Sequence, residues 1–190
     1  VEVALRDFRD VDGTFDRIVS VGMFEHVGLA HYDAFFHTCA DRLPRHGVML
    51  LHTIGLDDAP SLTNPWITKY IFPGGHLPAL SEILPAIERA GLLVTDIEVL
   101  RLHYAKTLRA WREAYMTKRS EAVGLYGDRF CRMWEYYLAM AETAFRFEKV
   151  VVYQIQLARR VDALPITRNY IASNEVRLAR ADRQCIDCGG

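Results

Sequence analysis

The sequence predicts an α/β fold built around a mostly parallel sheet. Residues 15–21 contain an apolar run of strand length, rich in β-branched side chains, which is typical of a strand buried on both faces. Further apolar runs of strand length occur at residues 48–54, 92–100 and 150–157. Helical patterns separate these runs, and strands that alternate with helices favour a parallel sheet.

Four segments have the residue spacing of helices. Residues 81–90 predict a short helix capped by Ser81, and longer helical stretches are expected at residues 107–117 and 128–147. Residues 29–43 place apolar side chains at i, i+3 and i+4, so one face of this helix is expected in the core. That face consists of Tyr32, Phe35, Phe36, Cys39 and Leu43.

Three segments are expected outside this alternation of strands and helices. Residues 1–5 alternate weakly and predict a strand that is followed by an acidic turn. Residues 60–75 are too rich in Pro and Gly for a long helix, and they predict a loop that carries aromatic side chains. From about residue 167 the chain turns polar, which predicts a loosely held tail.

The bulk properties restrict the class of protein. A chain of 190 residues is long enough for one domain with a sizeable core. The formal net charge of -1 gives no electrostatic reason to expect nucleic acid as a partner. No apolar run approaches the ~20 residues of a membrane span, so no transmembrane segment is predicted. No signal peptide is visible, and because the chain does not begin with Met, we expect it to be part of something larger.

The cysteines do not predict a disulfide framework or a metal site. Cys39 and Cys131 lie in helical patterns and are expected as small apolar core residues. Cys185 and Cys188 form one C-x-x-C, which supplies only half of a tetrahedral zinc site, so an unstructured tail is expected there. The histidines have no metal-ligand spacing, and no metal is predicted.

A candidate site lies where the first two predicted strands end. Glu25 follows the run at residues 15–21 after Gly22, and His52 lies at the end of the next run. If these strands pair in parallel, both side chains project into one cleft at the carboxyl edge of the sheet, where ligands bind in open α/β sheets. The alternative is a structural hydrogen bond between the His52 ring and the Glu25 carboxylate that locks two loops.

Other aromatic and imidazole side chains near this cleft allow two interpretations each. His26 is expected to point away, because its neighbour Glu25 points in. Tyr104 opens a helix after the third strand, either as a packing aromatic or as a catalytic hydroxyl. The aromatic segment 66–72 is expected as core or lid. The helix around Trp111 is basic and aromatic, so it could lie on an anionic bilayer or form a plain solvated face.

Several motifs, in the same order, resemble the cyclopropane-fatty-acyl-phospholipid synthase family. The resemblance runs from about Asp7 to Ile171 and implies the C-terminal half of a class I methyltransferase (Rossmann-like) sheet with an inserted helical lid. The segments that carry it are residues 16–28 (DRIVSVGMFEHVG), 50–55 (LLHTIG), 66–73 (WITKYIFP), 103–104 (HY), 108–111 (LRAW) and 144–146 (AFR).

The family resemblance implies a reaction and its catalytic residues. Members of this family add the methyl group of S-adenosylmethionine to a cis double bond of a phospholipid acyl chain. The resulting cation loses a proton to bicarbonate and closes to a cyclopropane. By resemblance, the catalytic residues are Glu25, His52 and Tyr104, and these side chains bind bicarbonate with help from the backbone of Ile54. Such an anion would also stabilise the cation electrostatically.

The resemblance covers only part of the cofactor site. It assigns Asp7 and Phe8 to the adenine ring and places Val21 in the same pocket. The glycine-rich loop that holds the methionine part of the cofactor is absent from this sequence. We therefore expect residues 1–171 to be the C-terminal part of a methyltransferase domain that lacks its first strands, and residues 172–190 to be a polar tail. Alone, this chain is expected neither to bind S-adenosylmethionine nor to methylate lipid.

The expected partners follow from the same resemblance. They are phospholipid acyl chains at the membrane surface, with the protein cytoplasmic and peripheral at the inner membrane, and a homodimer is possible. Without the strand that precedes it, the run at residues 15–21 is expected to present an apolar edge that invites pairing or aggregation. Two alternatives stay open: a related methyltransferase that acts on another acyl or amine substrate, and a non-catalytic lipid-binding remnant.

Overall fold

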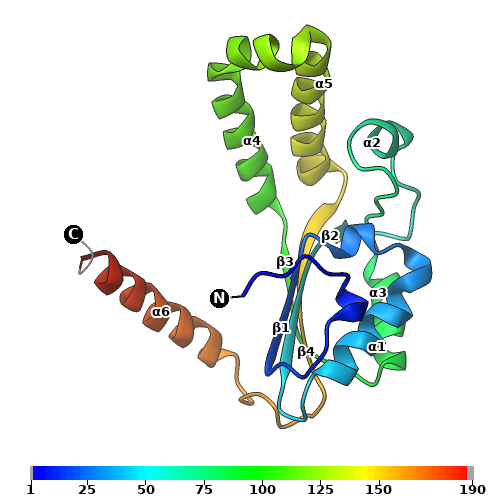
Figure 1. Cartoon of the computed structure of the whole chain (residues 1–190), viewed down its shortest axis with the longest axis vertical. Helices are drawn as coiled ribbons and strands as arrows, with labels where there is room; N and C mark the ends of the chain where they lie inside the picture. The colour runs from blue at the N-terminus through cyan, green and yellow to red at the C-terminus, as the bar shows by residue number, and fades with distance from the viewer. Residues whose placement is uncertain (1, 188–190) are drawn as a thin grey trace.

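The computed structural model describes residues 2–187, which hold one sheet of four strands (Figure 1). The strands are β1 (Arg17–Val21), β2 (Val48–Leu56), β3 (Leu93–Leu100) and β4 (Val150–Ala158), in the spatial order β1-β2-β4-β3. β1 and β2 pair in parallel, with Val21 opposite His52. β4 is antiparallel to both β2 and β3. The expectation of a mostly parallel sheet is therefore wrong beyond the first pair of strands.

The direction of β4 follows from the helical hairpin that precedes it. α4 (Leu102–Thr117) leaves the sheet at the end of β3, and α5 (Arg119–Phe147) returns to the same edge (Figure 1). A strand that starts at this edge must run back through the sheet, opposite to β2 and β3. The sequence predicts the two helices between the third and fourth strands, but not that they form a hairpin whose end returns to the edge where it began.

The remaining helices differ in how they meet the sheet. α1 (Tyr32–Arg42) and α3 (Leu80–Arg89) cover one face, and α2 (Pro65–Tyr70) lies in the long connection between β2 and α3 (Figure 1). α6 (Asn169–Asp187) extends away from the sheet. Three short 3-10 helices, at Phe8–Asp10, Phe24–His26 and Leu29–His31, complete the elements of the described chain.

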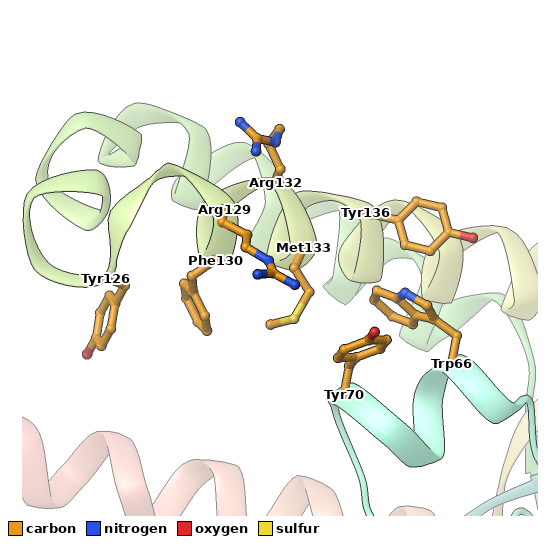
Figure 2. Close-up of a pocket in the computed structure, with 8 residues that line it drawn as sticks. All are labelled: Trp66, Tyr70, Tyr126, Arg129, Phe130, Arg132, Met133 and Tyr136. Atoms are coloured by element: carbon orange, nitrogen blue, oxygen red, sulfur yellow. The ribbon is translucent and has the colours of Figure 1, made fainter.

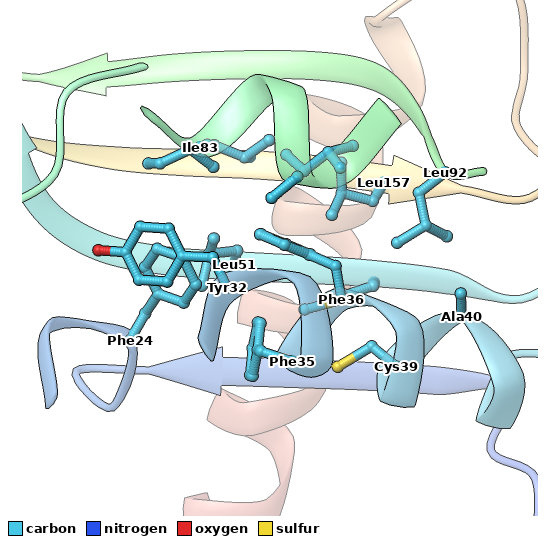
Figure 3. Close-up of a cluster of buried hydrophobic side chains, with 14 of the residues drawn as sticks. Phe24, Tyr32, Phe35, Phe36, Cys39, Ala40, Leu51, Ile83, Leu92 and Leu157 are labelled. Carbon is cyan, nitrogen blue, oxygen red and sulfur yellow. The ribbon is translucent and has the colours of Figure 1, made fainter. Parts of the chain in front are cut away.

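The main core lies between the sheet and the pair α1 and α3 (Figure 3). The apolar face predicted for residues 29–43 is buried throughout, which confirms that prediction. The Phe24 ring stacks on Tyr32 at a centroid distance of 4.2 Å and contacts Phe35 at 5.2 Å. Burial of each large apolar side chain contributes about 1.5–3 kcal/mol, so this cluster holds the loop after β1 against α1.

A second core cluster attaches the hairpin of α4 and α5 to the end of the sheet. Leu108 of α4 and Leu138 and Phe145 of α5 are buried together with Val150 and Val152 of β4. Because this cluster joins the bases of both helices to the strand that follows them, the start of α4 is fixed at the carboxyl edge of β2.

Several elements differ from their predictions in existence, capping or boundaries. Residues 2–7 form no strand, and the expected strand at residues 1–5 is wrong within the described part. Ser81 does not cap α3. Instead, the carboxylate of Glu82 accepts a hydrogen bond from the Ala79 amide at 2.8 Å. α5 begins at Arg119, nine residues before the predicted start, and is interrupted at Gly127 (φ 79°).

The polar end of the chain is helical where a loose tail was expected. α6 contains the expected domain border between residues 171 and 172. Cys39 and Cys131 are buried with unbonded thiols, as predicted. Of the predicted C-x-x-C pair, Cys185 falls within α6 and Cys188 lies outside the described residues.

β1 forms an edge of the sheet within the described chain. It pairs with β2 on one side only. Its side chains Val19 and Val21 point to the face opposite α1 and are 64% and 63% exposed. The apolar edge expected for residues 15–21 is therefore present, and such an edge is prone to pair with other chains. The prediction that this strand is buried on both faces is wrong within the described chain, because Val19 and Val21 lie on an open face.

Gly55 is tightly enclosed, which predicts a stability effect. A Cβ atom at this position would lie 2.5 Å from the Pro78 carbonyl oxygen and 2.6 Å from the Tyr153 ring. We expect Gly55→Ala to lower the free energy of unfolding by about 1–3 kcal/mol in urea titrations, because neither neighbour can move without disturbing β2 or β4. In α5, Gly124 has open space, and Gly124→Ala is expected to be neutral or stabilising by up to about 1 kcal/mol. If Gly55→Ala and Gly124→Ala lower the free energy of unfolding equally, the close packing around Gly55 is contradicted.

Candidate active site

The loop after β1 turns Glu25 into the protein. Gly22, at φ 64°, ends β1, and its amide donates to the His52 carbonyl at 3.2 Å. The short helix Phe24–His26 follows, and the buried Phe24 ring anchors it to the core. As a result Glu25 is buried, whereas His26 is exposed.

The Glu25 carboxylate binds the end of β2. Its Oε1 atom accepts a hydrogen bond from the Ile54 amide at 2.7 Å. Ile54 lies two residues beyond His52 on β2, so its amide points to the side where β1 would continue the ladder. β1 has already ended there, and the carboxylate occupies the place of the next strand carbonyl. Without this acceptor, the amide would lose a hydrogen-bond partner at a cost of about 1–3 kcal/mol.

The second carboxylate oxygen of Glu25, Oε2, is buried and has no hydrogen-bond partner within residues 2–187. Buried polar groups in folded proteins are satisfied by protein, water or ligand in the great majority of cases. A carboxylate oxygen only accepts hydrogen bonds, so the group that suits Oε2 carries a proton that it can donate.

Tyr104 lies in the first turn of α4, close enough to Glu25 for the carboxylate charge to act on its hydroxyl. Its ring packs on Phe145 at 4.9 Å and on Trp111 at 5.9 Å. Burial, followed by the negative charge of Glu25, raises the pKa of the Tyr104 hydroxyl. The hydroxyl therefore stays protonated and can donate a hydrogen bond at neutral pH. The two interpretations of Tyr104, packing and chemistry, are both compatible with this position.

His52 lies on β2 two residues before Ile54, and its side chain points to the same face as that of Ile54. The half-buried ring has its Nδ1 atom 3.3 Å from the Gln154 side-chain nitrogen. If the Gln154 amide nitrogen donates to Nδ1, the neutral ring carries its proton on Nε2. No hydrogen bond joins His52 to Glu25 in the described chain, which argues against the structural lock.

The long connection between β2 and α3 covers the loop of Glu25. Its α2 carries Trp66 and Tyr70, and Phe72 follows. The Phe72 ring contacts His26 at 5.7 Å and Tyr137 of α5 at 5.9 Å. Aromatic side chains from this connection therefore lie between the Glu25 loop and the hairpin, where a lid was one of the expectations.

A partly buried cluster next to Glu25 was missed by the sequence reasoning. The His76 amide donates to the Glu25 carbonyl at 2.9 Å, and its ring lies 3.2 Å from the Glu82 carboxylate. The Tyr32 hydroxyl is buried without a partner within the described residues, and burial, then Glu82 and Glu25, raise its pKa. The one available sequence signal was Glu82, which lies three residues after Ala79 as in a helix-capping pattern.

The residues assigned to adenine lie before and at the end of β1. The Asp7 carboxylate accepts from Arg9 at 2.7 and 2.9 Å, and this neighbour lowers the pKa of Asp7 to about 2. The Phe8 ring packs on Phe35 at 5.5 Å, and Val21 is exposed. The Arg9 amide donates a third hydrogen bond to this carboxylate at 2.9 Å, and the Oδ2 atom, which accepts only one of the three, keeps capacity for an amino group of a ligand.

The link between Glu25 and Ile54 predicts a difference between two variants. Glu25→Ala leaves the Ile54 amide without its acceptor, and we expect the free energy of unfolding to fall by about 1–3 kcal/mol in urea titrations. Glu25→Gln keeps a side-chain oxygen for this amide, so its loss is expected to be less than about 1 kcal/mol. If Glu25→Ala is as stable as the parent chain, this hydrogen bond is not structurally important.

Comparisons with known proteins relate this site to a family. The family described as "Mycolic acid cyclopropane synthetase" matches residues 1–155. Cyclopropane-fatty-acyl-phospholipid synthase of Escherichia coli (strain K12) is 40% identical over 162 residues, which cover 85% of this chain and 42% of that protein. Tuberculostearic acid methyltransferase UfaA1 of Mycobacterium tuberculosis is 41% identical over 165 residues, which cover 84% of this chain and 39% of that protein. The chain thus spans about two fifths of the length of these relatives.

A solved structure has a fold similar to that of this chain. Mycolic acid cyclopropane synthase CmaA1, complexed with SAH and CTAB, matches with a TM-score of 0.72 and 33% identity over 79% of this chain and 57% of that chain. The expected class I methyltransferase fold is confirmed over this partial region. From the sequence match and the fold together, the chain belongs to the mycolic acid cyclopropane synthetase family.

Proposed function

We propose that this chain carries the base-binding part of an S-adenosylmethionine-dependent methyltransferase that acts on fatty acyl chains. Membership of the family supports methyl transfer, and the SAH in the CmaA1 structure supports this cofactor. The names of the two relatives support an acyl substrate. The observation that carries the proposal is the Oε2 atom of Glu25, which is buried and has no hydrogen-bond partner within the described residues. The Glu25 charge also acts on the Tyr104 hydroxyl.

In finer detail, we propose that bicarbonate binds between Glu25, Tyr104 and His52. A negative ion can lie against the Glu25 carboxylate only through a shared proton, and the hydroxyl of bicarbonate supplies one to Oε2. The Tyr104 hydroxyl and the His52 Nε2 proton are donors suited to its other oxygens. Ile54 contributes by holding Oε1, so that the carboxylate keeps Oε2 for the ion.

The proposed reaction is cyclopropanation of a cis double bond in a phospholipid acyl chain. S-adenosylmethionine would supply the methyl group and leave as S-adenosylhomocysteine, so that the acyl chain carries the positive charge. A bicarbonate held by Glu25, His52 and Tyr104 would accept one proton from the added methyl, and the electron pair of that C–H bond would close the ring. The acyl chain gains one CH₂ in total. Glu25, His52 and Tyr104 hold the base beside the developing positive charge, which lowers the barrier electrostatically.

The remaining assignments are also proposals. Asp7, Phe8 and Val21 would contact the adenine ring, and residues 1–171 would belong to the methyltransferase domain, separate from residues 172–190. We further propose a cytoplasmic protein that acts at the inner membrane surface. Among the described helices, none has both the length and the apolar composition that crossing a bilayer requires.

A second candidate is methylation of the acyl chain without ring closure. The identity of 41% to tuberculostearic acid methyltransferase UfaA1 favours it, since this value is as high as that for the cyclopropane-forming relative. Both reactions would share the cofactor and the cationic intermediate. They differ in what proton loss produces: a ring in one, and a one-carbon branch with a double bond in the other.

The test is lipid analysis of cells that express the complete gene. We expect acyl chains that gain one CH₂ and lose the double bond, with the upfield methylene protons of a cyclopropane in NMR spectra. Glu25→Gln is expected to reduce this product at least about 100-fold, because the variant can no longer hold the base as a carboxylate does.

The matched control is Glu88→Gln on the exposed surface of α3, which is expected to leave the product unchanged. Branched or unsaturated one-carbon products in place of the ring would favour the second candidate. If the lipids do not change at all, or if Glu25→Gln yields as much product as the parent, the proposed site is wrong. A non-catalytic lipid-binding remnant would give the first of these two results.

A further inference from the structure

A groove lies between α2 and α5, on the outer part of the helical hairpin. Its volume is about 770 Å³. Figure 2 shows that Tyr126 and Phe130 of α5 line one part of it, while Trp66 and Tyr70 of α2 approach from the other side. This groove is distinct from the Glu25 site, and none of the catalytic assignments uses its residues.

The tip of the hairpin exposes large apolar side chains next to this groove. Leu125 is 77% exposed and Tyr126 is 65% exposed. Gly127, with φ 79°, interrupts α5 directly after them and leaves both at the turn between its two parts. Tyrosine and tryptophan side chains are enriched at membrane interfaces, where the ring is in an apolar layer and the polar atom is in water.

The groove also carries a cation without a counter-charge. Arg129, which points into it in Figure 2, makes no ion pair with a carboxylate in the described chain. The neighbouring Arg119 and Arg132 are both paired with Asp128. A guanidinium that is not used within the protein is suited to a phosphate group, which it can bind with two parallel hydrogen bonds.

The sequence suggested that the helix around Trp111, which is α4, could lie on an anionic bilayer, but its arginines are less available to bind lipid phosphate. In α4, Arg109 is paired with Glu113 at 2.9 Å, and Arg112 is paired with Glu142 of α5 at 3.3 Å. Both arginines of α4 are therefore engaged by carboxylates within the protein. Arg129 of α5 has no such partner in the described chain and lies in the groove with the aromatic side chains.

Aromatic side chains connect the groove with the candidate active site. Trp66 contacts Tyr136 at 4.8 Å on the groove side of α5. The next residue, Tyr137, contacts Phe72 at 5.9 Å and packs on the same core cluster as Tyr104. An acyl chain that enters at the groove would therefore meet an apolar surface as far as the Tyr104 hydroxyl.

We propose that this groove, with the exposed tip of α5, docks on the surface of a bilayer that contains anionic phospholipids. Arg129 would bind the lipid phosphate, Leu125 and Tyr126 would enter the interfacial layer, and one acyl chain would pass Trp66 towards the site. The proposal rests on the proposed function, because it assigns the groove to the entry of the same acyl substrate.

The shape of the molecule favours a membrane surface over other occupants. The hairpin projects beyond the carboxyl edge of the sheet, so its tip is the part of the carboxyl side farthest from the core (Figure 1). A projecting tip with aromatic and cationic side chains can enter a headgroup layer without moving the sheet. A second copy of this chain and an acidic protein are the competing occupants.

The test measures binding of the purified chain to vesicles of phosphatidylglycerol and phosphatidylcholine, by co-flotation and by tryptophan fluorescence. We expect binding that weakens with added salt and is much weaker on phosphatidylcholine alone. Arg129→Gln is expected to lower the partition coefficient about fivefold, and the double variant Leu125→Ser with Tyr126→Ser about tenfold. Trp66→Phe is expected to remove most of the fluorescence change while the chain still floats with the vesicles.

The matched control is Arg45→Gln, which removes the same charge from an exposed position before β2, at the opposite edge of the sheet. It is expected to bind as the parent does, and circular dichroism checks that all variants are folded. Absence of binding, equal binding to neutral vesicles, or equal effects of Arg45→Gln and Arg129→Gln would overturn the proposal. Self-association or capture of an acidic protein that Arg129→Gln abolishes, without vesicle binding, would also overturn it.

This experiment separates the docking surface from the chemistry. Vesicle binding through Arg129 can be observed even if the lipids of cells that express the complete gene do not change, in which case the proposed function fails and the docking surface remains. If the lipids of expressing cells gain the ring while Arg129→Gln binds vesicles as the parent does, the groove assignment alone is wrong.

Discussion

The hydrogen bond from the Ile54 amide to the Glu25 carboxylate is the constraint on which the candidate site depends. It forms because β1 ends earlier than β2, so that β2 continues with an amide that has no strand beside it. The carboxylate replaces that strand and becomes fixed at one oxygen. The other oxygen, Oε2, is buried and has no partner within the described residues. It can accept a hydrogen bond from a ligand that carries a proton. The difference in length between β1 and β2 thus determines how the Glu25 carboxylate is held.

The rest of the chain supports this hydrogen bond from three directions. The Phe24 ring, buried against α1, holds the loop that carries Glu25. The His76 amide binds the Glu25 carbonyl from the connection before α3. The hairpin of α4 and α5, attached to β4 by the second core cluster, brings Tyr104 to the same edge. These supports are far apart in the sequence, so the site forms only when the whole sheet is folded.

The sequence could predict the part of the site that depends on strand order. Glu25 follows β1, and β1 and β2 are parallel, as the prediction required, but β2 continues to Leu56, so His52 lies inside this strand and not at its end. The direction of β4 was not predictable, because it depends on the return of a two-helix hairpin to one edge. The position of Tyr104 depends on that hairpin as well. The cluster of His76, Glu82 and Tyr32 was missed because its members are brought together only by the packing of α1 and α3.

Hydrogen exchange at the Ile54 amide tests the central hydrogen bond most directly. In the parent chain this amide should exchange as slowly as the other amides of the β1–β2 ladder, and it should stay protected in Glu25→Gln. In Glu25→Ala its protection should fall to the level of an open strand edge, while the amides that bond β2 to β4 keep theirs. An Ile54 amide that exchanges rapidly in the parent chain, or equally slowly in Glu25→Ala, would contradict the role of Glu25 as the acceptor that holds the end of β2.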